Sequence, residues 1–209
     1  MQNQFDDVIS TREQLRAIID EPHELVVGKT IDHIDDICAR FIAACPYIVI
    51  GTRAADGLMD LSPKGDPAGF VHVANSKSLI IPDRLGNNRL DTFENLLVNP
   101  EIGVFFMIPG YTVTLRVRGT GTIVRDAALQ KQLAVNGKEP HLLLAVTVEE
   151  AFMQCAKSMA RSNIWKPEKW PDLSDVPSLA DAMLAHSSTE VEKQEWQDLI
   201  DDSFENKMY

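Results

Sequence analysis

Residues 112–124 carry the clearest periodic pattern in the chain. Thr and Arg side chains alternate there with an apolar series made up of Val113, Leu115, Val117 and Ile123. A period of two residues is typical of a strand that is buried on one face. Gly119 and Gly121 fall in the apolar phase, which indicates a bend or a close approach of another backbone segment. The pattern predicts a long, half-buried strand and favours a β-rich fold.

Further strand-like runs occur on both sides of this one. They are short and rich in apolar or β-branched residues, and they lie at residues 47–52, 58–61, 69–74, 78–81, 102–108 and 142–148. Turn signals separate them, for example Ala55-Asp56-Gly57 and Pro109-Gly110. About seven short strands with tight turns predict a mainly β fold, a small antiparallel barrel with peripheral helices, rather than alternating βαβ units.

Helical patterns flank the predicted barrel. We expect an N-terminal helical extension over 1–45, with a cap at Ser10 or Thr11 and an end before Pro46, a barrel core over 46–149, and a C-terminal helical segment with an acidic tail over 150–209. Short helices are also expected over 90–98 and from Asp126 to Val135. The tail at 188–208 fits either an amphipathic helix or a partly disordered segment.

Composition narrows the classes of partner. The 209 residues carry a formal net charge of −11, and many of the acidic residues lie near the C-terminus. Phosphate-backbone binding needs a field of Lys and Arg, so a nucleic-acid surface is not expected. Three cysteines and five histidines lack metal-ligand spacing. No apolar run approaches about 18 residues and no basic leader precedes one, so we expect a cytoplasmic protein that does not enter a membrane.

The region from Asp60 to Arg89 is the strongest candidate for a ligand site. Its basic residues are Lys64, Arg84 and Arg89, and Ser62, Asn87 and Asn88 add hydrogen-bond donors. Charged and amide donors of this kind can hold a phosphate group, and Arg89 precedes a predicted helix whose N-terminal dipole favours an anion. The Pro, Gly and Asn content suits loops that approach a ligand.

An alternative is that the same cations form ordinary surface ion pairs. Sequence neighbours would then pair as Lys64 with Asp66, Arg84 with Asp83 and Arg89 with Asp91. No dinucleotide-binding G-x-G-x-x-G, P-loop or G-x-S-x-G motif is present, so those sites are not predicted.

Six segments carry recognisable motifs, namely Phe41-Ile42-Ala43, Asp60 to Val71, Ile81 to Asn95, Ile108 to Gly110, Thr114 to Gly119 and Cys155 to Pro167. The motifs include S-P-K-G-D and I-P-D-R-L-G-N-N-R. Together they resemble those of the pyridoxamine 5′-phosphate oxidase-like group of FMN-binding split β-barrel proteins. The similarity extends over roughly Ile31 to Pro167.

The resemblance implies a homodimer of six-to-seven-stranded split barrels with FMN at the subunit interface. In that arrangement Ser62 and Lys64 contact the flavin or its phosphate. The other implied contacts are Arg84, Asn87, Asn88 and Arg89 on the phosphate and ribityl side, Ile81, Pro82 and Asp83 along the ring edge, and Lys157, Arg161 and Trp165 from the C-terminal motif, in one subunit or its partner. Trp165 fits packing as well as flavin contact.

The sequence departs from the authentic oxidase. It lacks that enzyme's R-x-V-L-L-K strand and its C-terminal substrate-phosphate motif, and Gln154 stands where relatives often have His. We therefore expect an FMN-dependent oxidoreductase of unknown substrate, with no catalytic side chain assigned because the flavin itself carries the electrons. The alternatives are an FMN carrier, sensor or regulatory protein without turnover, and a purely structural dimeric barrel.

Overall fold

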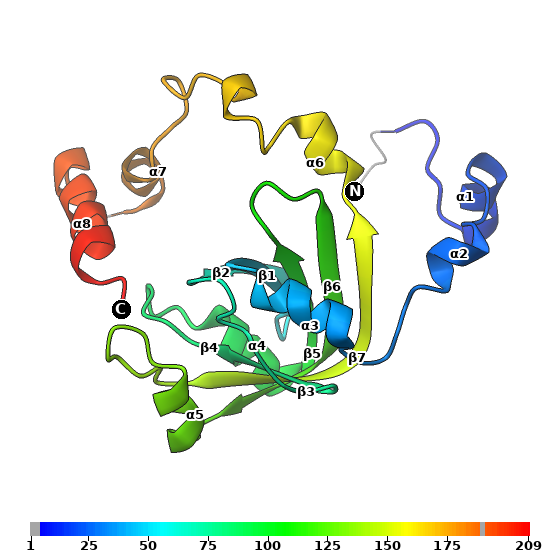
Figure 1. Cartoon of the computed structure of the whole chain (residues 1–209). Coiled ribbons are helices and arrows are strands. Elements are labelled where there is room, and N and C mark those ends of the chain that lie inside the picture. Colours follow the sequence, from blue (N-terminus) through cyan, green and yellow to red (C-terminus); the bar gives the residue numbers. More distant parts are fainter. Residues whose placement is uncertain (1–4, 189–190) are drawn as a thin grey trace. The chain divides into compact units, whose positions relative to one another are not determined.

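The computed structural model describes residues 5–188 and 191–209, which divide into a unit that ends at Thr30 and a unit from Ile31 to Tyr209 (Figure 1). The first unit holds α1 (Arg12–Ile18) and α2 (Glu24–Val27), neither of which has a buried residue. Thr11 caps α1 in a reciprocal capping box with Gln14, which confirms one of the two predicted caps.

The second unit is built on one seven-stranded sheet in which every strand pair is antiparallel. Its strands are β1 (Tyr47–Arg53), β2 (Met59–Gly65), β3 (His72–Asn75), β4 (Ser78–Pro82), β5 (Glu101–Met107), β6 (Val113–Val124) and β7 (Leu143–Cys155). The order in the sheet is β2-β1-β5-β6-β7-β4-β3. This confirms the predicted mainly β fold with peripheral helices, as in a split β-barrel.

The long strand predicted at 112–124 is β6, which pairs with β5 on one side and β7 on the other. The β6–β7 register shifts between Arg118 and Gly119. A Cβ atom on Gly119 would lie 1.8 Å from the carbonyl oxygen of Thr147. The close backbone approach predicted for this glycine is therefore confirmed, and it allows β7 to bend around β6.

The core fills the concave side of the sheet. Ile48, Ile50, Phe106, Leu115 and Val146 are all at most 1% exposed. Two helices cover this side: α3 (Asp36–Ala43), capped by the Asp35 side chain, and α4 (Asp91–Val98). On α4, the buried Asn95 donates a hydrogen bond of 3.0 Å to the Thr52 hydroxyl on β1, which fixes the helix over that strand.

Two expectations about local structure were wrong. The strand expected over 58–61 extends further, because β2 continues to Gly65. β2 is an edge strand, so Pro63, which has no N–H to donate, is tolerated there. The helical segment expected over 150–209 begins later, since β7 continues to Cys155. Pairing with β6 overrides the helical spacing of the apolar residues Phe152, Cys155, Ala156 and Met159.

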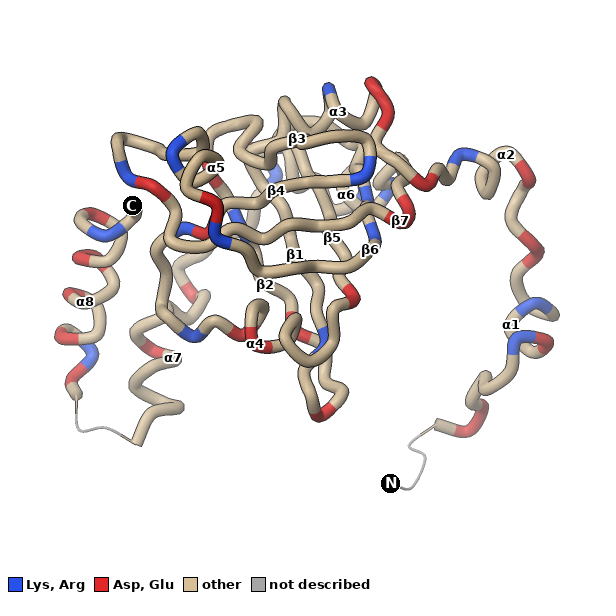
Figure 2. Tube along the Cα trace, turned by 90° about the horizontal axis from the view of Figure 1, so that it is seen from below, with Lys and Arg blue, Asp and Glu red and all other residues tan. Residues whose placement is uncertain are grey.

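Helices complete the unit. α5 (Ala127–Gln132) follows β6, and after β7 come α6 (Lys157–Ser162), a single 3₁₀ turn (Pro167–Lys169), α7 (Leu179–His186) and α8 (Lys193–Asn206). The described part of the predicted tail is thus mainly helical, while Thr189 and Glu190 lie outside the described residues. Figure 2 shows acidic residues along α8. Among the described residues, no helix is long and apolar enough to cross a membrane.

Candidate functional site

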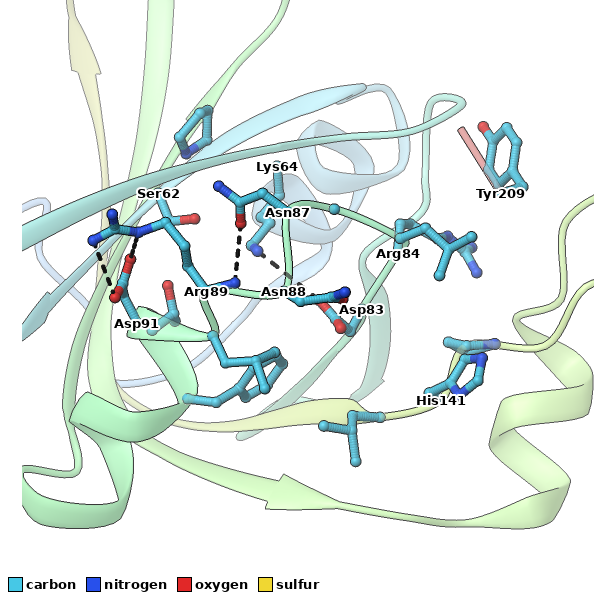
Figure 3. Close-up of a pocket in the computed structure, with 18 of the residues that line it drawn as sticks. Ser62, Lys64, Asp83, Arg84, Asn87, Asn88, Arg89, Asp91, His141 and Tyr209 are labelled. Carbon is cyan, nitrogen blue, oxygen red and sulfur yellow. Dashed lines mark hydrogen bonds and ion pairs between the residues drawn. The ribbon is translucent and has the colours of Figure 1, made fainter. Parts of the chain in front are cut away.

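A cavity of about 580 Å³ opens where the two ends of the curled sheet meet (Figure 3). Its walls come from three places in the sequence: β2 at residues 60–64, the segment 83–93 that leads from β4 into α4, and the segment 138–142 before β7. Tyr209 adds a fourth contact from beyond α8. The predicted basic region therefore forms two walls of one cavity.

Strand alternation directs one side of β2 into this cavity. Asp60, Ser62 and Lys64 are half-buried and line it, whereas Met59 and Leu61 point to the other face and are 68% and 70% exposed. In the register of β1 and β2, Lys64 lies opposite Ile48 and Ser62 lies opposite Ile50. The polar side chains of β2 are therefore on the same face of the sheet as the core residues of β1.

The two predicted basic segments are joined by crossed ion pairs. Lys64 Nζ lies 3.9 Å from Asp83 Oδ1, and Arg84 Nε donates a 2.6 Å hydrogen bond to Asp66 Oδ2. The alternative prediction had paired Lys64 with Asp66 and Arg84 with Asp83. That pairing is wrong, because Lys64 and Asp83 both face the cavity whereas Arg84 turns toward Asp66 at the edge of β2. Burial raises the pKa of the Asp83 carboxyl, and the nearby charge of Lys64 offsets part of that rise.

Arg84 is held by the protein itself. Besides Asp66, its Nη2 donates to the carbonyl oxygen of Leu133 at 2.9 Å. The Arg84 side chain is 15% exposed and that of Asp66 is 1% exposed. These partners hold the guanidinium in place and the Asp66 carboxylate balances its charge, so its principal role in this arrangement is to link the two segments.

Arg89 lies at the opposite end of the cavity from Arg84 (Figure 3). Its Nε donates a hydrogen bond to Asp91 at 2.7 Å, which confirms the ion pair predicted for Arg89 as the alternative. This hydrogen bond and the charge of Asp91 raise the pKa of Arg89. The side chain is 71% exposed, so it can turn toward a ligand. It precedes α4, whose N-cap residue Leu90 makes no side-chain cap bond, so the first amides of the helix remain available as donors.

Asp60 contributes a buried carboxylate oxygen, Oδ2, to the cavity wall. This oxygen has no hydrogen-bond partner among the described residues. A carboxylate oxygen in that state carries a desolvation penalty, which a ligand donor would relieve. Asp60 and Arg89 line the same cavity.

Some predicted site residues are elsewhere. Ile81 is 2% exposed in the core, and Pro82 is buried opposite Leu143 on β7, so neither lines the cavity. Lys157 and Arg161 lie exposed on α6, and Trp165 Nε1 donates to the Tyr111 carbonyl oxygen at 3.1 Å. The structure thus brings Ser62, Lys64, Asp83, Arg84, Asn87, Asn88 and Arg89 together, and leaves these five outside the cavity.

The sequence reasoning missed several cavity residues, among them the polar residues Asp60, Lys138, His141 and Tyr209. Asp60 could have been found from the alternation with Ser62 and Lys64 along β2. Lys138, His141 and Tyr209 carry no motif signal, because only tertiary contacts place them at the cavity. Among the described residues, no cluster of three or more His, Cys, Asp or Glu side chains could hold a metal ion.

Comparison with known proteins gives one family. Residues 34–155 match the family model described as pyridoxamine 5′-phosphate oxidase, which covers more than half of the chain and includes β2, β4 and most of the cavity wall. A comparison with curated proteins gives no match.

Solved structures show partial similarity. HupZ of Group A Streptococcus is 19% identical with a TM-score of 0.49, over 59% of this chain and 95% of that one. A putative pyridoxamine 5′-phosphate oxidase from Lactobacillus delbrueckii is 17% identical with a TM-score of 0.45, over 58% and 95%. The FAD binding protein from Mycobacterium smegmatis is 14% identical with a TM-score of 0.42, over 59% and 97%. Similarity at this level carries no argument about function.

Proposed function

Because the chain belongs to the pyridoxamine 5′-phosphate oxidase family through residues 34–155, we propose that it is an FMN-binding flavoprotein that catalyses an oxidoreduction. The observation that carries the proposal is the cavity between β2 and the segment 83–93. It combines Lys64 and Arg89 with Ser62 and two Asn side chains in a volume of about 580 Å³, a size typical of small-ligand sites.

The cavity residues fit both the phosphate group and the ribityl chain of FMN. Arg89, Asn88, Ser62 and the uncapped N-terminus of α4 offer donors for a phosphate group. The unpartnered Oδ2 of Asp60 requires a donor, which a ribityl hydroxyl can supply. Arg84 is assigned to holding the wall together rather than to the phosphate, since Asp66 and Leu133 already occupy it.

Bound FMN would supply the hydride or electron transfer. The protein's part is to bind and orient. Lys64 places a positive charge in the middle of the cavity, where it can face the flavin ring, and Asp83 holds that ammonium group from the opposite wall at 3.9 Å. Leu85, Leu90 and Phe93 add apolar surface to the lining.

We also propose that the protein acts as a homodimer. The outer face of β2 exposes Met59 and Leu61. Further along the sheet, on β5, β6 and β7, the Arg116 guanidinium lies 5.8 Å from the Phe105 ring and 5.9 Å from the Phe152 ring. An apolar face of this kind is suited to a second copy.

Leu61→Glu should give monomers in light scattering, whereas a chain shortened after Trp170 should remain dimeric. Monomers from the shortened chain would move the interface to the C-terminal segment.

An absorption spectrum of the purified protein, followed by titration with FMN and riboflavin, tests the function. We expect FMN to bind more tightly than riboflavin, and FMN at 100 times its Kd to add about 2.7 kcal/mol of stability. A colourless protein that gains no stability from FMN would favour the structural barrel. Reduction of the bound flavin by NADH or NADPH, with transfer to an acceptor, separates an enzyme from a carrier or sensor.

A further inference from the structure

Tyr209 makes three different contacts at the Arg84 end of the cavity. Its hydroxyl donates to Asp66 Oδ1 at 2.7 Å, its carbonyl oxygen accepts from Lys138 Nζ at 2.6 Å, and its ring lies 6.0 Å from the Arg84 guanidinium carbon. Figure 3 shows Tyr209 beside Arg84 at this end.

The three partners lie in or beside three separate cavity walls. Asp66 follows β2, Arg84 follows β4, and Lys138 lies between α5 and β7. The contacts to Asp66 and Lys138 span 143 and 71 residues of sequence. One residue therefore adds contacts across segments that Arg84 already links through Asp66 and Leu133.

Asp66 shows why the phenol hydroxyl matters. Its side chain is 1% exposed and accepts from both Arg84 and Tyr209, one on each carboxylate oxygen. Hydrogen bonds to a carboxylate are stronger than those between neutral groups. The bond also raises the pKa of Tyr209, so the phenol stays protonated and can donate. Loss of the hydroxyl would leave one carboxylate oxygen without this donor.

The segment that carries Tyr209 packs mainly against α7 rather than against the sheet. α8 has no buried residue, and it is linked to α7 by the Lys193–Asp181 ion pair of 2.6 Å. Few buried contacts mean that such a segment can open at low free-energy cost compared with the core.

We propose that residues 193–209 form a strap that closes the Arg84 end of the cavity and slows the exchange of bound ligand. The contacts of Tyr209 hold the strap in its closed position. Opening breaks the contacts of Tyr209 with Asp66 and Lys138, so that the contacts of Arg84 with Asp66 and Leu133 are left to hold the walls at this end. The effect of the strap on ligand exchange rests on the proposed function. The closing of the cavity walls by Tyr209 does not.

The first test measures FMN association and dissociation by stopped-flow flavin fluorescence. Tyr209→Ala should raise both rate constants about tenfold, the effect of losing a hydrogen bond to a charged group, while Kd changes less. Tyr209→Phe keeps the ring and carbonyl and should give a smaller increase. Met208→Ala, at a neighbouring residue that is 56% exposed, is the matched control and should behave as wild type. Rate constants within twofold of wild type in Tyr209→Ala would overturn the strap.

A second test needs no ligand. In hydrogen exchange of the free protein, residues 133–142 should exchange faster in Tyr209→Ala than in wild type or Met208→Ala, and equal exchange would overturn the strap. If wild type binds no FMN, the proposed function fails, and this measurement alone decides whether Tyr209 closes the walls.

Discussion

Lys64 Nζ lies 3.9 Å from Asp83 Oδ1, although the strands beside them are far apart in the sheet. Lys64 is on β2, the first strand of the order, and Asp83 directly follows β4, the sixth. No ladder hydrogen bonds join β2 to β4, so curling of the sheet brings the two residues together. The contact defines the middle of the candidate site.

The Asp83 carboxyl should titrate above its ordinary pKa of 3.8, because its burial outweighs the nearby charges that favour ionisation. Lys64→Met should raise that pKa further. Since the folded protein then binds this proton more tightly than the unfolded chain, the contribution of Asp83 to stability falls as pH rises from 3.8 through the raised value. Carboxyl NMR measures the midpoint. Lys77→Met, which removes a partner of Asp32, is the control.

Arg89→Ala should weaken FMN binding by about 10- to 100-fold, because a charged hydrogen bond to phosphate is worth roughly 1.5–3 kcal/mol. Riboflavin, which has no phosphate, should bind nearly as before. Arg125→Ala removes an exposed arginine that does not line the cavity and serves as the control. Calorimetric titration gives both affinities, and equal losses for the two ligands would contradict the phosphate role.

Arg84→Ala should lower the free energy of unfolding. It leaves the Asp66 carboxylate, 1% exposed, without its ion-pair partner, and breaking a buried pair costs about 3–5 kcal/mol. Urea unfolding, followed by far-ultraviolet circular dichroism, should show a lower midpoint than Arg89→Ala. If the two variants unfold alike, the structural role assigned to Arg84 is wrong.

Gly119→Ala should cost about 3 kcal/mol or more, since the added methyl group would overlap the Thr147 carbonyl oxygen at 1.8 Å and force β6 and β7 apart. Gly103→Ala on β5 is the matched control, because no described atom lies within 4 Å of its added Cβ. Urea midpoints compare the two. Similar midpoints would contradict the close approach of β7.

The three thiols should differ in reactivity. Burial raises the pKa of Cys38 to about 11 and also raises that of Cys45, whereas Cys155 is exposed. Since the thiolate is the reactive form, one thiol should react rapidly with a maleimide at pH 7 and the other two only on unfolding. Mass spectrometry of the labelled protein identifies the site, and rapid labelling of Cys38 would contradict its burial.

The amino-acid sequence by itself determined where most strands lie and most of the donors. Alternation over 112–124 gave β6, and the motif residues Ser62, Lys64 and Arg89 do line one cavity. These features are local, because they depend on side-chain period and residue type within one segment.

Only the tertiary structure decided the ion pairs and the closing contacts. Arg84 faces Asp66, and Tyr209 reaches Asp66 across 143 residues. Neither contact has a local signal, since each depends on how far the sheet curls and where a distant segment returns. Pairing with β6 likewise kept residues 149–155 in β7, because ladder hydrogen bonds along a long partner strand outweigh a helical spacing of apolar residues.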